Sequence, residues 1–179
     1  MAVAKATVLL AATAALAGCS LLKPTAAPPP SGGKPDACHL LTDKQVHLAL
    51  GGAPKSTEDL SSAAMPVSCR YVGQGDAYLT ISAHRVTDVV DAQSELAGAR
   101  KSCPTATALD TSEMNVDTAT GLICPATPTG GGAITWAEWQ TIVLKVELRP
   151  GGQRTPAGTG HRIAQATNQL QSSLTVDSF

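Results

Sequence analysis

The segment Ala77-Tyr78-Leu79-Thr80-Ile81-Ser82-Ala83-His84-Arg85-Val86 decides the fold class. Its odd-numbered residues Leu79, Ile81 and Ala83 are apolar, whereas the even-numbered residues between them are polar. Such alternation is typical of an antiparallel strand with one buried face, because successive side chains of a strand point to opposite sides. Residues 67–72 predict a second short strand, and the turn-forming residues 73–76 join the two strands in a hairpin.

Helices are predicted on both sides of this hairpin in the sequence. Ahead of it, Thr42 and Gln45 match a capping box, and Gly51-Gly52 ends the helix as a left-handed cap requires. After it, residues 88–102 carry apolar residues at intervals of three and four, with acidic residues near the start and basic residues at the end. Pro104 stops this second helix.

The second half of the chain continues with strands and a last helix. Residues 121–126 predict a short strand, and residues 133–148 predict a long strand with a turn or bulge around residues 137–140. The last helix is expected over residues 160–174, and residues 53–66 are interpreted as a loop.

Runs of strands separated by helices favour an α+β fold, with an antiparallel sheet and helices packed mainly on one face. We expect the helices over residues 88–102 and 160–174 to cover that face together, because each has one apolar stripe. The other face, which carries Thr80, Ser82 and His84, is then left open.

The N-terminus has the pattern of a bacterial lipoprotein signal. Lys5 is followed by an apolar run over residues 6–16, which is shorter than the roughly 20 residues that a membrane-spanning helix needs. The run ends in Leu16-Ala17-Gly18-Cys19, where small residues precede a cysteine that can be acylated. We therefore predict a signal peptide over residues 1–18 and a lipid anchor at Cys19 on the extracytoplasmic face of the cell membrane. The alternative is an ordinary secretory signal with an incidental cysteine.

A proline-rich segment separates this anchor from the rest of the chain. Residues 19–35 combine prolines with small and polar residues and show no hydrophobic periodicity. We interpret them as a semi-rigid tether, and residues 36–179 as a single domain. A proline-rich ligand for a partner protein is the alternative interpretation of the tether.

The composition narrows the function and predicts cross-links. A net charge of −1 with 15% charged residues gives no indication of nucleic-acid binding. Setting Cys19 aside, four of the five cysteines remain, and an even number in an exported chain predicts two disulfides. We favour sequential pairing, Cys38 with Cys69 and Cys103 with Cys124, because shorter loops close more readily. The absence of a C-x-x-C pair leaves a zinc ribbon or a thioredoxin-type site unsupported.

The start of the domain resembles a known family. Asp36-Ala37-Cys38-His39-Leu40-Leu41-Thr42 matches a D-x-C-x-L-L-T opening, and Cys69-Arg70-Tyr71 matches a later C-x-aromatic strand. Both are similar to a large group of actinobacterial cell-envelope lipoproteins of unknown function, and the likeness covers roughly residues 36–85. The resemblance implies an exported envelope lipoprotein with no agreed activity and no catalytic residues to transfer.

No catalytic, cofactor or metal motif is present in the sequence. None of the four histidines forms an H-E-x-x-H motif, and there is no G-x-S-x-G elbow. Ser82 and His84 share a strand face, but they lack the third group that would orient the histidine. We therefore predict no cofactor and no metal site, and we lean away from an enzyme.

Two tryptophans suggest a binding surface instead. Trp136 and Trp139 could stack against a ligand, since tryptophan offers a large amphipathic contact area, although they could equally fill the core. With Thr80, Ser82 and His84 they make the candidate binding set. The resulting hypothesis is a non-catalytic envelope module that binds a lipid, a small ligand or a protein partner. The alternative is an envelope hydrolase with a dispersed active site.

Overall fold

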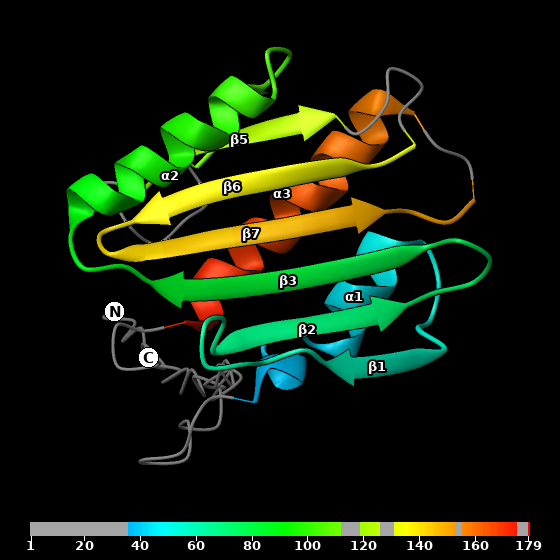
Figure 1. Ribbon diagram of the computed structural model, residues 1–179. Coiled ribbons are helices and arrows are strands. Elements are labelled where there is room, and N and C mark those ends of the chain that lie inside the picture. Colours follow the sequence, from blue (N-terminus) through cyan, green and yellow to red (C-terminus); the bar gives the residue numbers. More distant parts are fainter. Residues whose placement is uncertain (1–35, 112–118, 126–130, 153–154, 175–178) are drawn as a thin grey trace, which may run out of the picture. The chain divides into compact units, whose positions relative to one another are not determined.

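The computed structural model describes residues 36–111, 119–125, 131–152, 155–174 and 179. These residues form a seven-stranded sheet and three α-helices, and every strand pair in the sheet is antiparallel (Figure 1). The predicted α+β class is therefore confirmed. The predicted signal peptide, Cys19 and the tether lie outside the described residues.

The strand order across the sheet is β1-β2-β3-β7-β6-β5-β4. The strands are β1 (Ser56–Asp59), β2 (Val67–Val72), β3 (Tyr78–Arg85), β4 (Thr107–Ala108), β5 (Thr120–Pro125), β6 (Ala133–Trp139) and β7 (Ile142–Arg149). The helices are the short 3-10 turn η1 (Ala37–His39), α1 (Asp43–Leu50), α2 (Val89–Ser102) and α3 (Pro156–Ser173). The central pair, β3 and β7, thus joins the two halves of the chain, with Ile81 opposite Val146.

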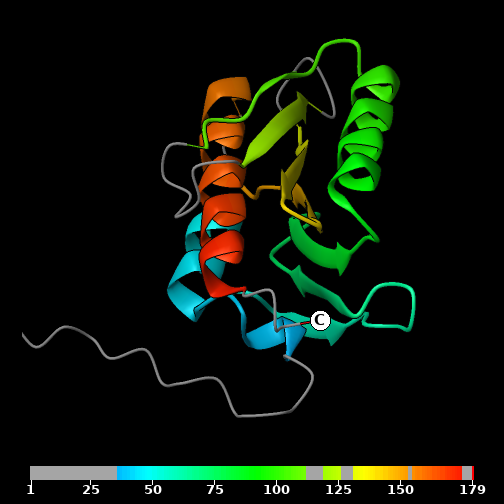
Figure 2. The same ribbon diagram turned by 90° about the vertical axis from the view of Figure 1, so that its left-hand side faces the viewer.

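The helices lie on both faces of the sheet. Figure 2 shows α1 and α3 on one side of the strands and α2 on the other. Since α1 and α3 together hold most of the helical residues, the helices do pack mainly on one face. The expectation that α2 shares that face with α3 is wrong, because Leu122 and Val143 are buried on the opposite face, where α2 packs against β5, β6 and β7.

The main core lies between the sheet and the pair α1 and α3. The apolar residues of the predicted alternation, Leu79, Ile81 and Ala83, are fully buried there. They pack in one cluster with Leu144, Val146 and Leu148 of β7 and with Ile163 and Leu170 of α3. The hydroxyls of Thr135 and Thr167 hydrogen bond at 2.6 Å within this interface and so satisfy each other.

The first helix begins and ends as the sequence predicts. The Thr42 side chain accepts from the Gln45 backbone N–H, and Gln45 Oε1 accepts from the Thr42 N–H at 2.7 Å, which completes the capping box. Gly51 closes the helix with φ of 76°, a left-handed conformation that glycine adopts without a Cβ penalty.

Two boundaries differ from the prediction, and the predicted interruption of the long strand is present. Residues 56–59 form the edge strand β1 rather than a loop; all four side chains are exposed, so no hydrophobic alternation marks them. The last helix starts at Pro156 rather than near Gly160, because Thr155 caps it by accepting from the Gly158 N–H. The predicted break in the long strand is a tight turn between β6 and β7, where Gln140 has φ of 55°.

Candidate functional site

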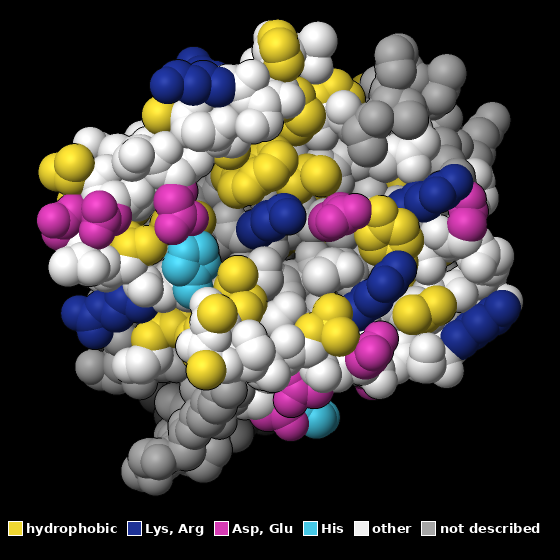
Figure 3. All heavy atoms as spheres, viewed as in Figure 1, with side chains coloured by type: hydrophobic (Ala, Val, Ile, Leu, Met, Phe, Trp, Pro, Cys, Tyr) yellow, Lys and Arg dark blue, Asp and Glu magenta, His cyan; other side chains and the backbone are white. Residues whose placement is uncertain are grey.

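The polar side of the predicted alternation lies on the same face of the sheet as α2. Cross-strand pairing sets Arg70, Thr80 and Glu147 in one row, and Ser82, Lys145 and Trp136 in the next. We call this surface the open face and define it by Arg70, Tyr78, Thr80, Ser82, His84, Trp136, Lys145 and Glu147. Figure 3 shows this face, on which charged side chains of both signs alternate with apolar ones.

One edge of the open face is bordered by α2. His84 Nε2 lies 3.0 Å from Glu95 Oε1, so that an ion pair can link β3 to the helix when His84 is protonated. The Cys103–Cys124 disulfide joins the residue that follows α2 to β5, and the two cysteines are 21 positions apart in the sequence. The helix is thereby fixed at its C-terminal end and packs mainly against β6.

The two tryptophans do not form one surface. Trp136 is half-buried on the open face, where Lys145 Nζ lies 5.8 Å from the centroid of its ring. Trp139 is 8% exposed and packs in the core on the other face. The expected pair is therefore wrong: residues three apart on a strand point to opposite faces, because side chains alternate. Trp136 remains in the candidate site and Trp139 leaves it.

Tyr78 supplies a second aromatic ring that the sequence analysis missed. Its hydroxyl donates to Glu147 Oε1 at 2.5 Å, and the Arg70 guanidinium carbon lies 4.9 Å from the ring centroid. Burial, together with the hydrogen bond and charge of Glu147, raises the pKa of Tyr78 above its ordinary value. Tyr78 is one of the even-numbered residues of the alternating segment, so the sequence alone could have predicted that it shares a face with Thr80.

Glu138 is the second residue that sequence reasoning missed. It follows Trp136 by two positions on β6 and therefore points to the same face, yet only 7% of it is exposed. One carboxylate oxygen, Oε1, accepts a hydrogen bond of 2.7 Å from the Thr120 hydroxyl. The other oxygen, Oε2, is buried and has no hydrogen-bond partner among the described residues. Nothing in the sequence around Glu138 predicts that this charged side chain is buried.

The residues considered for hydrolysis are engaged elsewhere. Ser82 Oγ donates to the backbone carbonyl of Lys145 at 3.3 Å, and the His84 ring faces Glu95. In a serine hydrolase, the nucleophilic hydroxyl is hydrogen bonded to the histidine that accepts its proton. Among the residues that the structure describes, no group of three His, Cys, Asp or Glu side chains could hold a metal ion.

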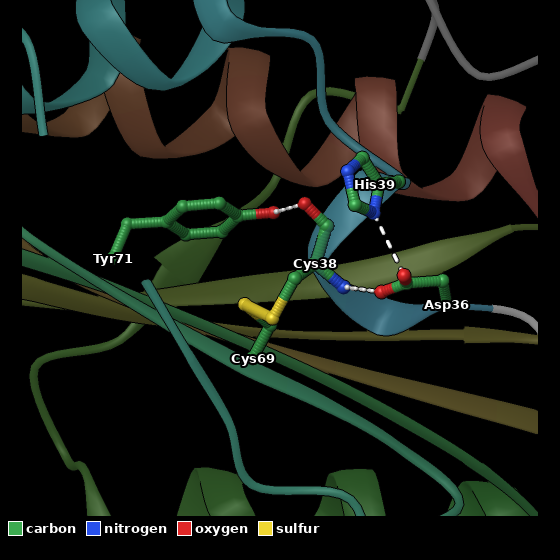
Figure 4. Close-up of polar contacts among 5 residues, drawn as sticks. All are labelled: Asp36, Cys38, His39, Cys69 and Tyr71. Carbon is green, nitrogen blue, oxygen red and sulfur yellow. Dashed lines mark hydrogen bonds and ion pairs between the residues drawn. A yellow bond between two sulfur atoms is a disulfide. The ribbon is translucent and has the colours of Figure 1, made fainter. Parts of the chain in front are cut away.

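The residues that carry the family resemblance meet at the start of the domain. Cys38 of η1 and Cys69 of β2 form a disulfide, and Tyr71 Oη donates to the Cys38 carbonyl at 3.1 Å (Figure 4). Asp36 accepts from the Cys38 N–H at 3.0 Å and from the His39 ring at 2.8 Å. These side chains fix the entry of the chain onto the sheet. Both predicted cysteine pairings, this one and Cys103–Cys124, are present.

Comparison with known proteins adds little to this picture. No protein-family model and no curated protein matches the chain. The extracellular domain of PknH from Mycobacterium tuberculosis is a similar solved structure, with 10% identity and a TM-score of 0.41, covering 74% of this chain and 92% of that one. At that TM-score the similarity supports no conclusion about function. In the described part of the chain, no helix has the length and apolar character needed to cross a membrane.

Proposed function

We propose that the chain is an exported lipoprotein of the cell envelope, held on the membrane by an acylated Cys19, and that its domain binds a polar partner through the open face without catalysis. The proposal joins the N-terminal sequence pattern to the geometry of the sheet. The hydrolase alternative has no specific support, since Ser82 and His84 do not interact as nucleophile and base.

Export is supported by the cysteines. Disulfides form and persist in oxidising compartments and are rare where thiols are kept reduced. The two pairs, Cys38–Cys69 and Cys103–Cys124, are each formed between elements that the fold brings together. A signal-like N-terminus ahead of such a domain agrees with a location outside the cytoplasm.

Binding rests on one observation, the half-buried Trp136 on the open face beside Lys145. An indole in this position offers apolar area together with an N–H donor, while Thr80 and the charged residues keep the rest of the face polar. A face of this mixed character suits a polar ligand better than an acyl chain. Antiparallel faces are tolerated in water, so the part of this face that α2 leaves uncovered needs no further cover.

Lipidation is tested by intact-mass analysis of the membrane fraction. We expect wild-type chains that begin at Cys19 and carry acyl groups, and Cys19→Ala chains that do not. A wild-type chain that is unacylated and keeps residues 1–18 would contradict the anchor.

Binding is tested by the emission of Trp136. The W139F variant keeps Trp136 as its one tryptophan, and it is titrated separately with the protein, polysaccharide and lipid fractions of the envelope. A spectral shift that disappears when Trp136 is also replaced supports the open face. Unchanged emission with every fraction would overturn it. Leu48→Ala, at an exposed position of α1, is the control for an unrelated surface change.

A further inference from the structure

We propose that the open face binds a carbohydrate, with the Trp136 ring stacked on the apolar face of a sugar and Glu138 accepting hydrogen bonds from its hydroxyls. This inference rests on the proposed binding function and names its ligand class. It is carried by Glu138, a buried carboxylate whose hydrogen bonding the fold does not fully satisfy.

The buried oxygen of Glu138 points to a missing donor. Burying a polar group without a hydrogen bond is costly, and buried side-chain oxygens are therefore almost always paired. Glu138 is 7% exposed, and within the described part of the chain its Oε2 has no hydrogen-bond partner, whereas Oε1 accepts from the Thr120 hydroxyl. This carboxylate already accepts one hydroxyl, and a second hydroxyl on Oε2 would complete its hydrogen bonding.

Trp136 lies at the right place to hold the rest of such a ligand. The two residues are two apart on β6, on one face and roughly 7 Å from each other along the strand. That separation is about the width of one sugar ring. Lys145 is directly opposite Trp136 on β7, so its ammonium group can donate to a further hydroxyl.

The charges of the face favour a neutral ligand over a cationic one. Each aromatic ring of the face already has a cation of the chain itself against it, Lys145 on Trp136 and Arg70 on Tyr78. Lys145 also offsets the charge of Glu138, its diagonal neighbour across β6 and β7. A cationic peptide would compete with these groups, whereas the hydroxyls of a sugar can bond to both charges.

Because Oε2 is buried, a ligand would reach it only if α2, which packs against β6, moved aside. The helix itself buries only the small residues Ala92 and Ala99. Leu122 and Val143 of the sheet, which are buried on the face where α2 packs, set the apolar area that such a movement exposes. The Cys103–Cys124 disulfide keeps the C-terminal end of the helix in place. The link between His84 and Glu95 is solvent-accessible and contributes little to closure.

The test combines binding with stability. The mature protein in detergent is titrated with maltotetraose and with the tetramer of N-acetylglucosamine, by calorimetry and Trp136 emission. We expect binding of at least one oligosaccharide and a loss of at least tenfold in affinity for Glu138→Leu and for Trp136→Ala. We also expect Glu138→Leu to raise the urea midpoint, because it removes an unsatisfied buried oxygen. Glu58→Gln, an exposed carboxylate on β1, is the matched control and should change neither measurement.

The outcomes separate this inference from the function on which it rests. A shift of Trp136 emission with a lysine-rich peptide or with phospholipid vesicles, and with neither sugar, overturns the ligand class and leaves the binding function standing. If no probe changes the Trp136 emission, both the carbohydrate ligand and the binding function of the open face are overturned. A lowered urea midpoint for Glu138→Leu with unchanged sugar binding shows a structural carboxylate and also overturns the inference. Glu138→Gln, which keeps the shape of the side chain, distinguishes loss of charge from loss of packing.

Discussion

Trp136 and Trp139 lie on opposite faces of β6, one beside Lys145 on the open face and the other in the core between the sheet and α3. The two tryptophans are only three positions apart on the strand, yet their surroundings are unrelated. The first is partly exposed on the open face, and the second packs in the core at the end of the strand.

This difference is measurable by fluorescence quenching. In W139F, where Trp136 alone emits, iodide should quench strongly, because the ring is accessible and Lys145 attracts the anion. In W136F, where Trp139 alone emits, quenching should be weak, because that ring is 8% exposed. Equal quenching of the two variants would contradict the assignment of the two faces.

Removing the disulfides should lower stability by similar amounts but at different places. The cysteines are 31 residues apart in one pair and 21 in the other. For loops of this length the chain-entropy model gives about 3 to 4 kcal/mol each. Urea unfolding of C38A/C69A and of C103A/C124A measures the loss. Hydrogen exchange should then show faster opening of α2 in the second variant alone; faster opening of α2 in the first would contradict this.

Stability should fall in strong alkali because of Tyr71. Burial, followed by the carboxylates of Asp36 and Asp43, raises the pKa of Tyr71 to about 12 from 10.0. Between these two pH values the unfolded chain has lost the phenol proton that the folded chain still holds, so ionisation favours unfolding. The contribution is fully present below pH 10 and is lost as the pH rises towards 12.

Tyr71→Phe tests this pH dependence. Because it removes the hydrogen bond to the Cys38 carbonyl, it should cost about 1 kcal/mol at neutral pH. It should also make the alkaline decline in the free energy of unfolding shallower, with the remainder due to Tyr78, whose pKa is raised as well. Parallel curves for the variant and wild type between pH 10 and 12 would refute the assignment to Tyr71.

The capping box of α1 can be tested by a single substitution. Thr42→Ala removes the side-chain acceptor for the Gln45 N–H and should lower the free energy of unfolding by about 1 kcal/mol. Urea unfolding followed by circular dichroism measures this. Thr87→Ala, at an exposed position just ahead of α2, controls for the loss of a threonine hydroxyl and should have little effect.

Local patterns predicted much of the fold. The alternation around Ile81 predicted β3 and its buried face, the capping residues predicted α1, and the count of cysteines predicted two sequential disulfides. Each of these depends on residues close in sequence or on simple loop closure. The face on which α2 lies was not predictable in this way, because an apolar stripe shows that a helix is buried but not against which side of a sheet.

The candidate site was only half predicted. Thr80, Ser82 and His84 do share the face that Trp136 occupies, since the alternation fixed their direction. Trp139 was assigned to the wrong face, although residues three positions apart on a strand point to opposite faces. Glu138 had no sequence signal for burial: its cross-strand neighbours Val143 and Thr120, and α2 on the same face, are brought to it only by the fold.

The Cys38–Cys69 disulfide also has a mechanical consequence. It joins the first turn of the domain directly to β2, near the far end of a loop that contains α1 and β1. Tension applied to the chain ahead of Asp36 would therefore pass from Cys38 through covalent bonds into β2. Neither α1 nor the edge strand β1 would carry load, and rupture would require shearing β2 from its hydrogen-bonded neighbour β3. A domain held on a surface by its N-terminus could in this way withstand drag without unravelling from that end.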